Sequence, residues 1–393
     1  MSADYQSIRG KTSIVGVGTA GCGAAPGYSD IELLSLAAHR AVQDAGLNMR
    51  DIDGLATAHL SAAMWPLNVA EYLGLRPTFV EGTNLGGSAF VGQMLQAAHA
   101  LMHGECSAVL VCYGSNQKTS SVSRRQRLRA RTMLDPYTYE EPYQPLLAPS
   151  SYALMASRHM HQYGTTRRQL AEVAVAARRW AQLNPEAYAR DDLSIEDVLN
   201  AKVVSDPLGA LDCCLVTDGA GAFVMTRSDR AKDLPRKPIQ LLSCSTALWH
   251  RQVSGMADLT ITPASESGPR ALRGAGLAVK DIDVVQLYDA FTINVLLFLE
   301  DIGFCAKGEG GAFVEDGGIA PGGHLPVNTN GGGLSCVHPN MYGVFEVIEA
   351  VRQLRGEAGE RQVLGARTGL VHGNGGISAA SQSTAILTNE AAT

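Results

Sequence analysis

Two segments of the chain repeat one pattern at an offset of 230 residues, and this repeat constrains the fold more than any other feature. Residues 41–55 (AVQDAGLNMRDIDGL) and 271–285 (ALRGAGLAVKDIDVV) align without gaps and share two Ala positions, a Gly-Leu pair and an Asp-Ile-Asp triplet. Each copy is predicted to be a helix that ends at glycine (Gly46 or Gly276), a short capped turn and a strand. The chain is therefore expected to contain two halves with one common fold.

A second pair of segments supports the duplication. Asn84-Leu-Gly-Gly-Ser88 in the first half and Asn330-Gly-Gly-Gly-Leu-Ser335 in the second half are each predicted to open a helix. We place the two halves at residues 1–235 and 236–393.

The order of elements in the first half predicts an α/β domain with helices on both faces of its sheet. Apolar β-rich runs alternate with helical patterns, in the order strand 13–21, helix 29–46, strand 52–60, helix 88–104 and strand 108–115. Ser29 or Asp30 is the expected N-cap of the first of these helices. Residues 119–205 have a different texture, rich in charge, Tyr and Pro, and are interpreted as an insertion. Its basic run RRQRLRAR (124–131) would either attract cofactor phosphates or form a solvated helix face.

The composition excludes several classes of protein. Apolar residues make up 46% of the 393 residues and charged residues 18%, with a formal net charge of −6, which indicates a compact soluble protein that does not bind nucleic acid. No apolar run approaches the roughly 18 residues of a membrane span, and the N-terminus lacks a signal-peptide core, so a cytoplasmic location is expected. The eight cysteines show no CxxC spacing, which argues against a zinc site and against a disulfide framework.

Several motifs occur together in an order that resembles the thiolase superfamily, in particular the sterol-carrier-protein-type (lipid-transfer-protein-type) thiolases. These motifs are YGTT (163–166), NPEAYA (184–189), LDCCLVTDGAGAFV (211–224), YDAFT (288–292), GFCAKGEGG (303–311) and NTNGGGLSCVHP (328–339). The resemblance covers essentially the whole chain. It implies a five-layer αβαβα thiolase fold with two mixed five-stranded sheets, and an inserted loop domain that covers CoA. It also implies a homodimer that binds a small OB-fold protein with a zinc ribbon to form a heterotetramer.

The chain departs from this family at the nucleophile. Counted back from His103-Gly104, the residue that matches the catalytic cysteine of thiolases is Gly87. A thiolase needs that cysteine because its thiolate adds to the carbonyl and holds the released acyl group as a thioester. Ser88 is the neighbouring residue, and we expect it to be an N-cap or to donate a hydrogen bond to substrate. Cys336 is the thiol nearest to the other site motifs.

Two tyrosines replace family residues around the same site. Tyr288 of YDAF stands where the sterol-carrier-type thiolases have a histidine that polarises the thioester, next to Asp289. Tyr342 enters the segment after His338-Pro, and His372 of HGNGG falls near the position of a second thiolase cysteine. This constellation resembles the aldolases that remove the side chain of steroid CoA thioesters, with Tyr288 and Tyr342 as the catalytic pair. We include Asp289, His338 and His372 as further catalytic candidates.

The resemblance therefore implies retro-aldol cleavage of a branched 3-hydroxyacyl-CoA to a ketone and a shorter acyl-CoA. A base takes the β-hydroxyl proton, an oxyanion hole holds the enolate, and an acid protonates its carbon. Tyrosine suits this chemistry if neighbouring donors or positive charge lower its pKa. The sequence does not decide which tyrosine is the base and which is the acid, and it does not identify the acyl group.

Candidate substrate-binding positions lie in the two glycine-rich loops. They are Gly87, Ser88, Asn330, Gly332 and Gly333, because small residues admit a ligand closely. We expect no metal and no tightly bound cofactor, with CoA entering as part of the substrate. Two other functions stay open at this point: a thiolase-like acyltransferase that forms C–C bonds, and a non-catalytic subunit that binds acyl-CoA or lipid.

Overall fold

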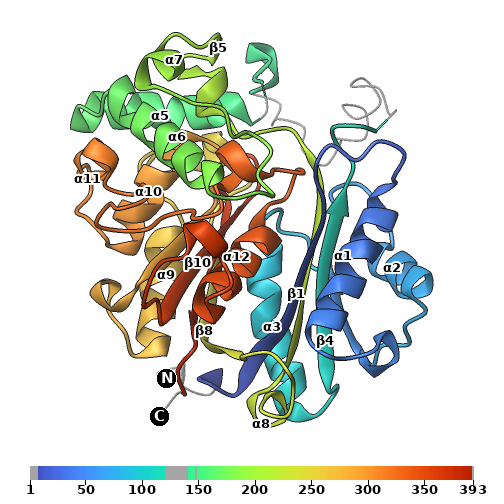
Figure 1. The fold of residues 1–393 in the computed structure, drawn as a ribbon. Helices are drawn as coiled ribbons and strands as arrows, with labels where there is room; N and C mark the ends of the chain where they lie inside the picture. The colour runs from blue at the N-terminus through green and yellow to red at the C-terminus, as the bar shows by residue number, and fades with distance from the viewer. Residues whose placement is uncertain (1–7, 121–139, 147, 392–393) are drawn as a thin grey trace.

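The computed structural model describes residues 8–120, 140–146 and 148–391 of the chain (Figure 1). The basic run at 124–131 lies outside the described residues. The elements of the first half lie on one side of the molecule in Figure 1 and those of the second half on the other. The helices inserted into the first half, α5 to α7, lie at one end of the molecule, on the side of the second half.

The two halves contain corresponding elements in the same order. The first half has β1 (Thr12–Gly23), α1 (Asp30–Asp44), β2 (Gly54–Thr57), α2 (Trp65–Leu73), β3 (Phe79–Glu81), α3 (Ala89–His103), β4 (Ala108–Ser115), β7 (Asp218–Arg227) and α8 (Ser228–Ala231). The second half has β8 (Ile239–Leu248), α9 (Ala264–Ala275), β9 (Val284–Leu287), α10 (Thr292–Ile302), α11 (Gly310–Val314), α12 (Gly343–Arg355), β10 (Thr368–Gly375) and β11 (Ser381–Thr388). The predicted duplication is therefore present in the structure.

The repeated Asp-Ile-Asp triplet performs the same two tasks in both halves. The first aspartate closes a short turn, where Asp51 accepts from the Asn48 N–H and Asp281 from the Ala278 N–H, each at 2.8 Å. The second aspartate accepts hydrogen bonds from two successive backbone N–H groups at the start of the neighbouring parallel strand. Asp53 thus binds the amides of residues 107 and 108 before and in β4, and Asp283 those of residues 367 and 368 at the start of β10. These bonds fix each strand relative to its neighbour, so the motif is a structural signal.

The ends of the first helix follow from its sequence. Ser29 is the N-cap of α1, and it forms a capping box in which its side chain accepts from the Glu32 amide while Glu32 accepts from the Ser29 amide. Gly46 and Gly276 follow α1 and α9 with φ of 71° and 67°, a left-handed conformation in which glycine is favoured. Both predictions for these helix ends are confirmed.

The strands of the two halves form one mixed sheet, which corrects the expectation of two separate five-stranded sheets. Its nine strands lie in the order β3-β2-β4-β7-β1-β8-β11-β10-β9, with five strands from the first half and four from the second. The halves join where Ser13 and Ile14 of β1 pair with Gln240 and Ile239 of β8.

The missing fifth strand of the second half is reduced to one bridge, between Val285 and Val327. It cannot lengthen because Pro326 has no N–H, and Asn328 has a left-handed backbone with φ of 53°. The Asn328 side-chain oxygen instead accepts from the Leu287 N–H at 2.7 Å.

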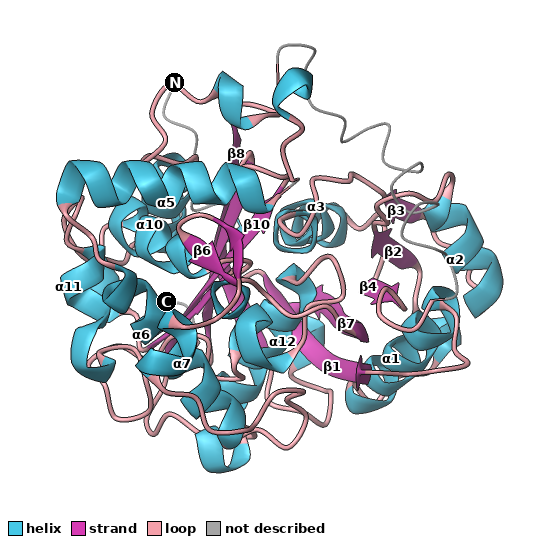
Figure 2. Ribbon diagram, turned by 90° about the horizontal axis from the view of Figure 1, so that it is seen from above, coloured by secondary structure: helices cyan, strands magenta, loops and turns pink. Residues whose placement is uncertain are grey.

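Helices cover both sides of this sheet. Helix α1 packs on β1, β4 and β7, whereas α9 packs on β8 and β11. Helices α3 and α12 contact each other and strands of both halves, so they lie between the two parts of the sheet (Figure 2). Their facing side chains are fully buried, including Phe90 and Met94 of α3 and Val347 and Val351 of α12. The first turns of α3 and α12 therefore lie in the interior of the protein.

The insertion lies between the antiparallel neighbours β4 and β7. Its described elements are α5 (Pro149–Tyr163), α6 (Arg167–Gln182), α7 (Ile195–Leu199), β5 (Val203–Ser205) and β6 (Leu208–Gly209). A buried contact ties it to the second half, because His159 of α5 lies 3.0 Å from the Glu300 carboxylate of α10. Within the described ranges, no helix is both long enough and apolar enough to cross a membrane.

Candidate active site

The candidate site forms where the carboxyl end of β9 meets the N-termini of α3 and α12. Tyr288 and Asp289 directly follow β9, and the segment 337–342 leads into α12. The two helix starts are in close contact, since a Cβ at Gly343 would lie 2.1 Å from the Gly87 carbonyl oxygen. Carboxyl ends of parallel strands and helix N-termini are frequent positions of ligand sites in α/β proteins.

The two glycine-rich loops are followed by different structures. Helix α3 begins directly after the Asn84 to Ser88 segment, as expected. The segment at Asn330 instead forms a π-helical turn (Gly332–Cys336), and α12 begins only at Gly343. The expectation of a helix at Asn330 is wrong because Gly331 and Gly332 have φ of 103° and 64°, which turns the chain around Asp289.

Tyr288 occupies the space of the missing nucleophile. A Cβ built on Gly87 would lie 2.1 Å from Tyr288 Cε2 and 2.6 Å from Cζ, and 2.7 Å from the Asn374 carbonyl oxygen. Contacts this short do not occur between real side chains, so any residue larger than glycine at position 87 requires the Tyr288 ring to move. Gly87 and Tyr288 are therefore complementary in shape.

Tyr288, Tyr342 and His338 form one buried aromatic cluster. The Tyr288 ring stands edge-on to His338 and to Tyr342, with centroid distances of 5.6 and 5.7 Å. The Tyr342 N–H donates to the Tyr288 hydroxyl at 3.1 Å, and the Tyr342 hydroxyl donates to Asn330 Oδ1 at 2.9 Å. The structure thus brings together three of the predicted catalytic residues.

Asp289 stabilises the glycine-rich turn. Among the described residues, it forms no hydrogen bond to either tyrosine hydroxyl. Its carboxylate accepts from the Gly333 amide at 2.6 Å and from the Leu334 amide at 3.3 Å. A Cβ at Gly332 would lie 1.9 Å from Asp289 Oδ2, so glycine is required there. Asn330 accepts from the Gly332 amide at 2.8 Å as well as from Tyr342. These predicted substrate-binding residues make internal contacts, and their contact with substrate stays a prediction.

The surroundings of the cluster shift the pKa values of its two tyrosines upward. Burial raises the pKa of Tyr288 and of Tyr342 well above the ordinary value, and nearby negative groups add to this effect. The condition under which tyrosine suits this chemistry, a pKa lowered by donors or positive charge, is therefore not met, because burial desolvates both hydroxyls. Both tyrosines are neutral at pH 7 and need a partner to accept a proton.

His338 and Asp289 are also shifted by burial. The pKa of His338 is lowered to about 4, so its imidazole is neutral at pH 7. Among the described residues, its Nε2 atom has no hydrogen-bond partner. Burial raises the pKa of Asp289 to about 7, although the Gly333 and Leu334 amides oppose the shift. A neutral imidazole with a free ring nitrogen is able to donate a hydrogen bond to a developing oxyanion.

Ser88 lies at the N-cap of α3, but its side chain does not cap the helix. Its hydroxyl lies 3.1 Å from the Leu85 carbonyl oxygen and 2.7 Å from Ser381 Oγ. Ser88 is fully buried, and these contacts tie the helix start to β11.

His372 lies on the opposite face of the sheet from the cluster. Its Nδ1 atom lies 2.8 Å from Thr384 Oγ1, which in turn contacts Ser267 of α9, and its ring packs at 4.7 Å on Phe298 of α10. The next residue in β10, Gly373, faces α3 instead, as the alternation of a strand requires. The structure does not bring the His372 side chain to the tyrosine pair, which corrects its assignment to the site.

Glu346 is the residue at this site that the sequence did not indicate. It lies in the first turn of α12, four residues after Tyr342, and it is fully buried. Its Oε2 atom would lie 3.5 Å from a Cβ at Gly343. The sequence could have indicated Glu346 by its spacing of four residues from Tyr342, because residues four apart on a helix share a face.

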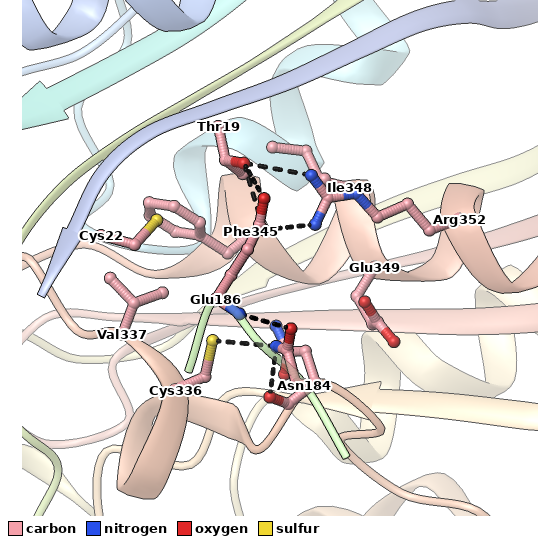
Figure 3. Close-up of a pocket in the computed structure, with 11 residues that line it drawn as sticks. Thr19, Cys22, Asn184, Glu186, Cys336, Val337, Phe345, Ile348, Glu349 and Arg352 are labelled. Atoms are coloured by element: carbon pink, nitrogen blue, oxygen red, sulfur yellow. Dashed lines mark hydrogen bonds and ion pairs between the residues drawn. The ribbon is translucent and has the colours of Figure 1, made fainter. Parts of the chain in front are cut away.

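Two thiols lie near the site. Cys214 is next to the Tyr288 segment, since its backbone N–H donates to the Ala290 carbonyl oxygen at 2.8 Å, and burial raises its pKa. Cys336 is enclosed more deeply. Cys336 Sγ accepts from Asn184 Nδ2 at 3.5 Å, and burial raises its pKa well above the ordinary thiol value. It lines a cavity of about 10 Å³ with Thr19, Cys22, Glu186 and Arg352 (Figure 3). Such a cavity has room for about one water molecule and none for an acyl chain.

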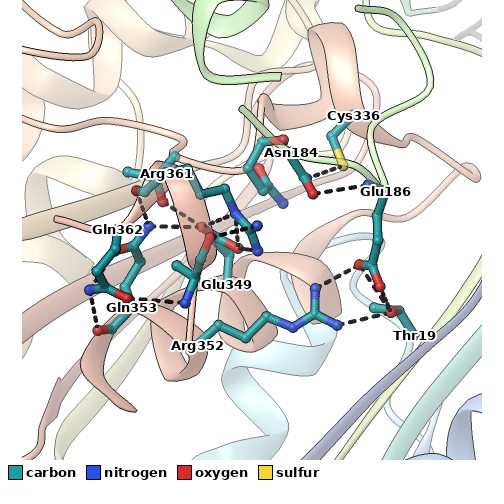
Figure 4. Close-up of polar contacts among 12 residues, drawn as sticks. Thr19, Asn184, Glu186, Cys336, Glu349, Arg352, Gln353, Arg361 and Gln362 are labelled. Atoms are coloured by element: carbon teal, nitrogen blue, oxygen red, sulfur yellow. Dashed lines mark hydrogen bonds and ion pairs between the residues drawn. The ribbon is translucent and has the colours of Figure 1, made fainter. Parts of the chain in front are cut away.

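A buried ionic network borders this cavity. Glu349 accepts from Arg361 at 2.9 Å and from Thr329 at 2.7 Å, and Arg352 donates to Glu186 at 2.7 Å (Figure 4). Because these charges are paired, the network holds α12 in position, and a catalytic role is not indicated.

Comparisons with known proteins agree with this geometry. Residues 245–389 match the family described as Thiolase C-terminal domain-like. The chain is 33% identical over 375 residues to an acetyl-CoA acetyltransferase of Methanothermobacter thermautotrophicus, covering 93% of this chain and 96% of the relative. It is 32% identical over 365 residues to the 17-hydroxy-3-oxo-4-pregnene-20-carboxyl-CoA lyase of Mycobacterium tuberculosis, covering 89% of this chain and 92% of the relative.

Further similarity is found to aldolases. A steroid side-chain-cleaving aldolase of Thermomonospora curvata is 33% identical over 367 residues, with 89% of this chain and 91% of the relative covered. A chain of the solved Ltp2-ChsH2(DUF35) aldolase superposes with a TM-score of 0.85 at 31% identity, over 97% of this chain and 98% of that chain. The fold and these relatives define the class: the chain belongs to the thiolase superfamily, in its sterol-carrier-protein-type group.

Proposed function

We propose that this protein is a carbon–carbon lyase that cleaves a branched 3-hydroxyacyl-CoA by retro-aldol chemistry, without an acyl-enzyme. The observation that carries the proposal is the exchange at the nucleophile position, where the Tyr288 ring fills the space beside Gly87. Claisen chemistry needs a thiolate at that point. Retro-aldol chemistry needs proton transfer there, and tyrosine hydroxyls supply it.

The residues of the cluster match the three requirements of the reaction. One tyrosine of the pair takes the proton of the β-hydroxyl as the bond between the α- and β-carbons breaks. His338 donates from its unpartnered Nε2 to the thioester oxygen of the enolate, helped by the N-termini of α3 and α12. The other tyrosine then protonates the α-carbon. Asp289 fixes the loop beside His338, since a Cβ at Gly333 would lie 3.0 Å from His338 Cδ2.

For the substrate we propose a steroid or bile-acid side-chain CoA ester. The name of the Mycobacterium tuberculosis relative describes a compound with a hydroxyl on carbon 17 and the CoA thioester on carbon 20. That hydroxyl is β to the thioester carbonyl. Retro-aldol cleavage of this compound leaves a ketone at carbon 17 and propionyl-CoA, and the same chemistry applies to any 3-hydroxyacyl-CoA whose β-carbon is fully substituted.

We further propose that the chain forms a homodimer in the cytoplasm and binds a small OB-fold protein with a zinc ribbon. The name of the Ltp2-ChsH2(DUF35) aldolase, which joins two components, supports the presence of a partner. The homodimer is supported by β3, which is an edge strand of the sheet. The side chains on and beside this edge are exposed and apolar: Met64, Leu67 and Val80 are 73%, 62% and 52% exposed. Free edges and apolar patches of this kind favour association between chains. The eight cysteines, all unpaired, fit a reducing compartment.

The proposal is tested with a panel of 3-hydroxyacyl-CoA esters, incubated with the protein alone and with the candidate partner, and analysed by product mass. We expect a ketone and a shorter acyl-CoA in equal amounts. Tyr288→Phe and Tyr342→Phe are each expected to lower kcat by about 100-fold or more with the fold kept, as judged by circular dichroism. Near-wild-type turnover in both variants would rule out the tyrosine mechanism.

The acyltransferase alternative has support from the Methanothermobacter relative but not from the site of this chain. It requires a cysteine nucleophile, and burial raises the pKa of both nearby thiols, Cys336 and Cys214, well above the ordinary value, which disfavours the reactive thiolate. Tight binding of acyl-CoA without turnover in the presence of the partner would instead indicate the non-catalytic binding subunit.

A further inference from the structure

Glu346 is a buried carboxylate without a hydrogen-bond partner in the described part of the chain. Its residue is 0% exposed, and among the described residues neither of its carboxylate oxygens has a hydrogen-bond partner. Three residues further along the same helix, Glu349 is equally buried but is bound by Arg361 and Thr329. An unpaired buried carboxylate costs several kcal/mol when ionised, so its presence in α12 calls for a functional reason.

Glu346 lies close to the titratable groups of the active site. It follows Tyr342 by one helical turn, and its Oε2 atom would lie 3.5 Å from a Cβ at Gly343, the residue after Tyr342. The Tyr342 N–H in turn donates to the Tyr288 hydroxyl at 3.1 Å, and the Glu346 carboxylate acts electrostatically on both tyrosines.

Asp289 also acts on Glu346 electrostatically, and the His338 ring stacks on the Tyr342 ring at a centroid distance of 6.3 Å. The Cys214 thiol is a further titratable group beside Tyr288. Burial also raises the pKa of Glu346 well above its ordinary value, so its carboxylate binds a proton more readily than an exposed one.

The tyrosine pair needs such a group. Both hydroxyls are neutral at pH 7, and a neutral tyrosine accepts a substrate proton only if it passes its own proton on. The Tyr342 hydroxyl donates to Asn330, an amide that cannot take the proton. Glu346 is the acid–base group next to both tyrosines whose oxygens have no other partner among the described residues.

We propose that Glu346 is the proton-holding residue of the tyrosine pair. This inference rests on the proposed retro-aldol function. Glu346 starts the reaction ionised and acts through the tyrosines, without touching the substrate.

The proton balance closes without an added reactant. As the bond between the α- and β-carbons breaks, its electron pair stays on the α-carbon as the enolate, and the hydroxyl oxygen becomes the ketone oxygen. The hydroxyl proton moves to the first tyrosine, whose own proton moves to Glu346. The second tyrosine then gives its proton to the α-carbon and is refilled from Glu346, which returns to its ionised form.

The test compares wild type, Glu346→Gln and Glu349→Gln in the presence of the partner, with 17-hydroxy-3-oxo-4-pregnene-20-carboxyl-CoA as the probe. In the wild type, kcat/KM is expected to rise with pH as Glu346 ionises. Glu346→Gln is expected to lower kcat by about 100-fold or more and to abolish this acid limb. Its melting temperature is expected to be at least that of the wild type, because a buried unpaired carboxylate is removed. Glu349→Gln breaks a paired network, so it is expected to melt earlier with the pH profile unchanged.

A second measurement does not depend on turnover. The infrared difference spectrum between wild type and Glu346→Gln is expected to contain a protonated carboxylic acid band that disappears over the pH range in which the wild-type rate rises. A wild-type enzyme that cleaves the probe while Glu346→Gln keeps both rate and pH profile would overturn the inference and leave the proposed function intact. Absence of the acid band throughout the pH range of the folded protein would also overturn it. Failure of the wild type on the probe and on the whole 3-hydroxyacyl-CoA panel, in contrast, would overturn the proposed function itself.

Discussion

The ring of Tyr288 lies against the Cα atom of Gly87, in the space where a side chain at residue 87 would begin. A Cβ there would lie 2.1 Å from Tyr288 Cε2. The two residues are far apart in sequence, and their contact links the loss of a nucleophile in the first half to the gain of a tyrosine in the second. The glycine is therefore a requirement of the tyrosine site.

This relationship predicts the effect of Gly87→Ala. Overpacking a rigid interior site destabilises a protein by about 1–3 kcal/mol, so we expect a loss of that size in the free energy of unfolding, measured by denaturant titration. Turnover should fall as well, because the Tyr288 ring is displaced. In the background of Tyr288→Ala the same substitution should cost less, although the Asn374 carbonyl contact at 2.7 Å remains. Equal costs in both backgrounds would contradict the proposed packing.

The position of His372 predicts that it contributes to stability and not to catalysis. Burial lowers its pKa to about 3, below the value of about 6.5 of an unfolded histidine. Because the folded pKa is the lower one, this contribution is present above pH 6.5 and is lost as the pH falls toward 3. The melting temperature of His372→Asn should therefore depend less on pH in this range than that of the wild type. Its kcat should stay near the wild-type value, and a loss comparable to that of Tyr288→Phe would restore His372 to the site.

Cys336 provides a control for covalent chemistry. Its thiol is buried and its pKa is raised well above the ordinary value, so little thiolate forms at neutral pH. Cys336→Ser is expected to keep turnover within a few-fold of wild type, because serine also accepts a hydrogen bond from Asn184. A complete loss of activity with an unchanged melting temperature would show that this thiol participates.

The exposed edge of β3 predicts a dimer interface. Val80→Lys puts a charge on that edge and should shift the protein from dimer to monomer in light scattering, since charged edge residues oppose strand pairing. Leu364→Lys is the matched control, because Leu364 is 91% exposed but lies outside the Met64, Leu67 and Val80 patch. An unchanged mass for Val80→Lys would place the dimer contact elsewhere.

Much of the fold could be predicted because its signals are local. The repeat, the capping box at Ser29 and the left-handed glycines after α1 and α9 depend on a few neighbouring residues. The reduced fifth strand of the second half was missed, since it depends on the conformation of Asn328 and its bond to Leu287 across the fold.

The candidate site was predictable only in part. Motifs indicated Tyr288, Tyr342 and His338, but β10 is buried on both faces, so its pattern did not show which way His372 points. Helix α12 is likewise covered along nearly its whole length, which hides Glu346 among residues that an amphipathic pattern would assign to the surface. The direction of the tyrosine pKa shifts could not be predicted from the sequence either, because it is set by burial, which depends on the complete fold.

The central claim is that C–C cleavage proceeds without an acyl-enzyme. It is tested most directly by the mass of the intact protein during turnover of 17-hydroxy-3-oxo-4-pregnene-20-carboxyl-CoA with the partner present, alongside the masses of the products. We predict an unchanged protein mass, with the carbon-17 ketone and propionyl-CoA formed in equal amounts and no release of free CoA. An added acyl mass on the protein, or a product that forms only when free CoA is supplied, would contradict the account.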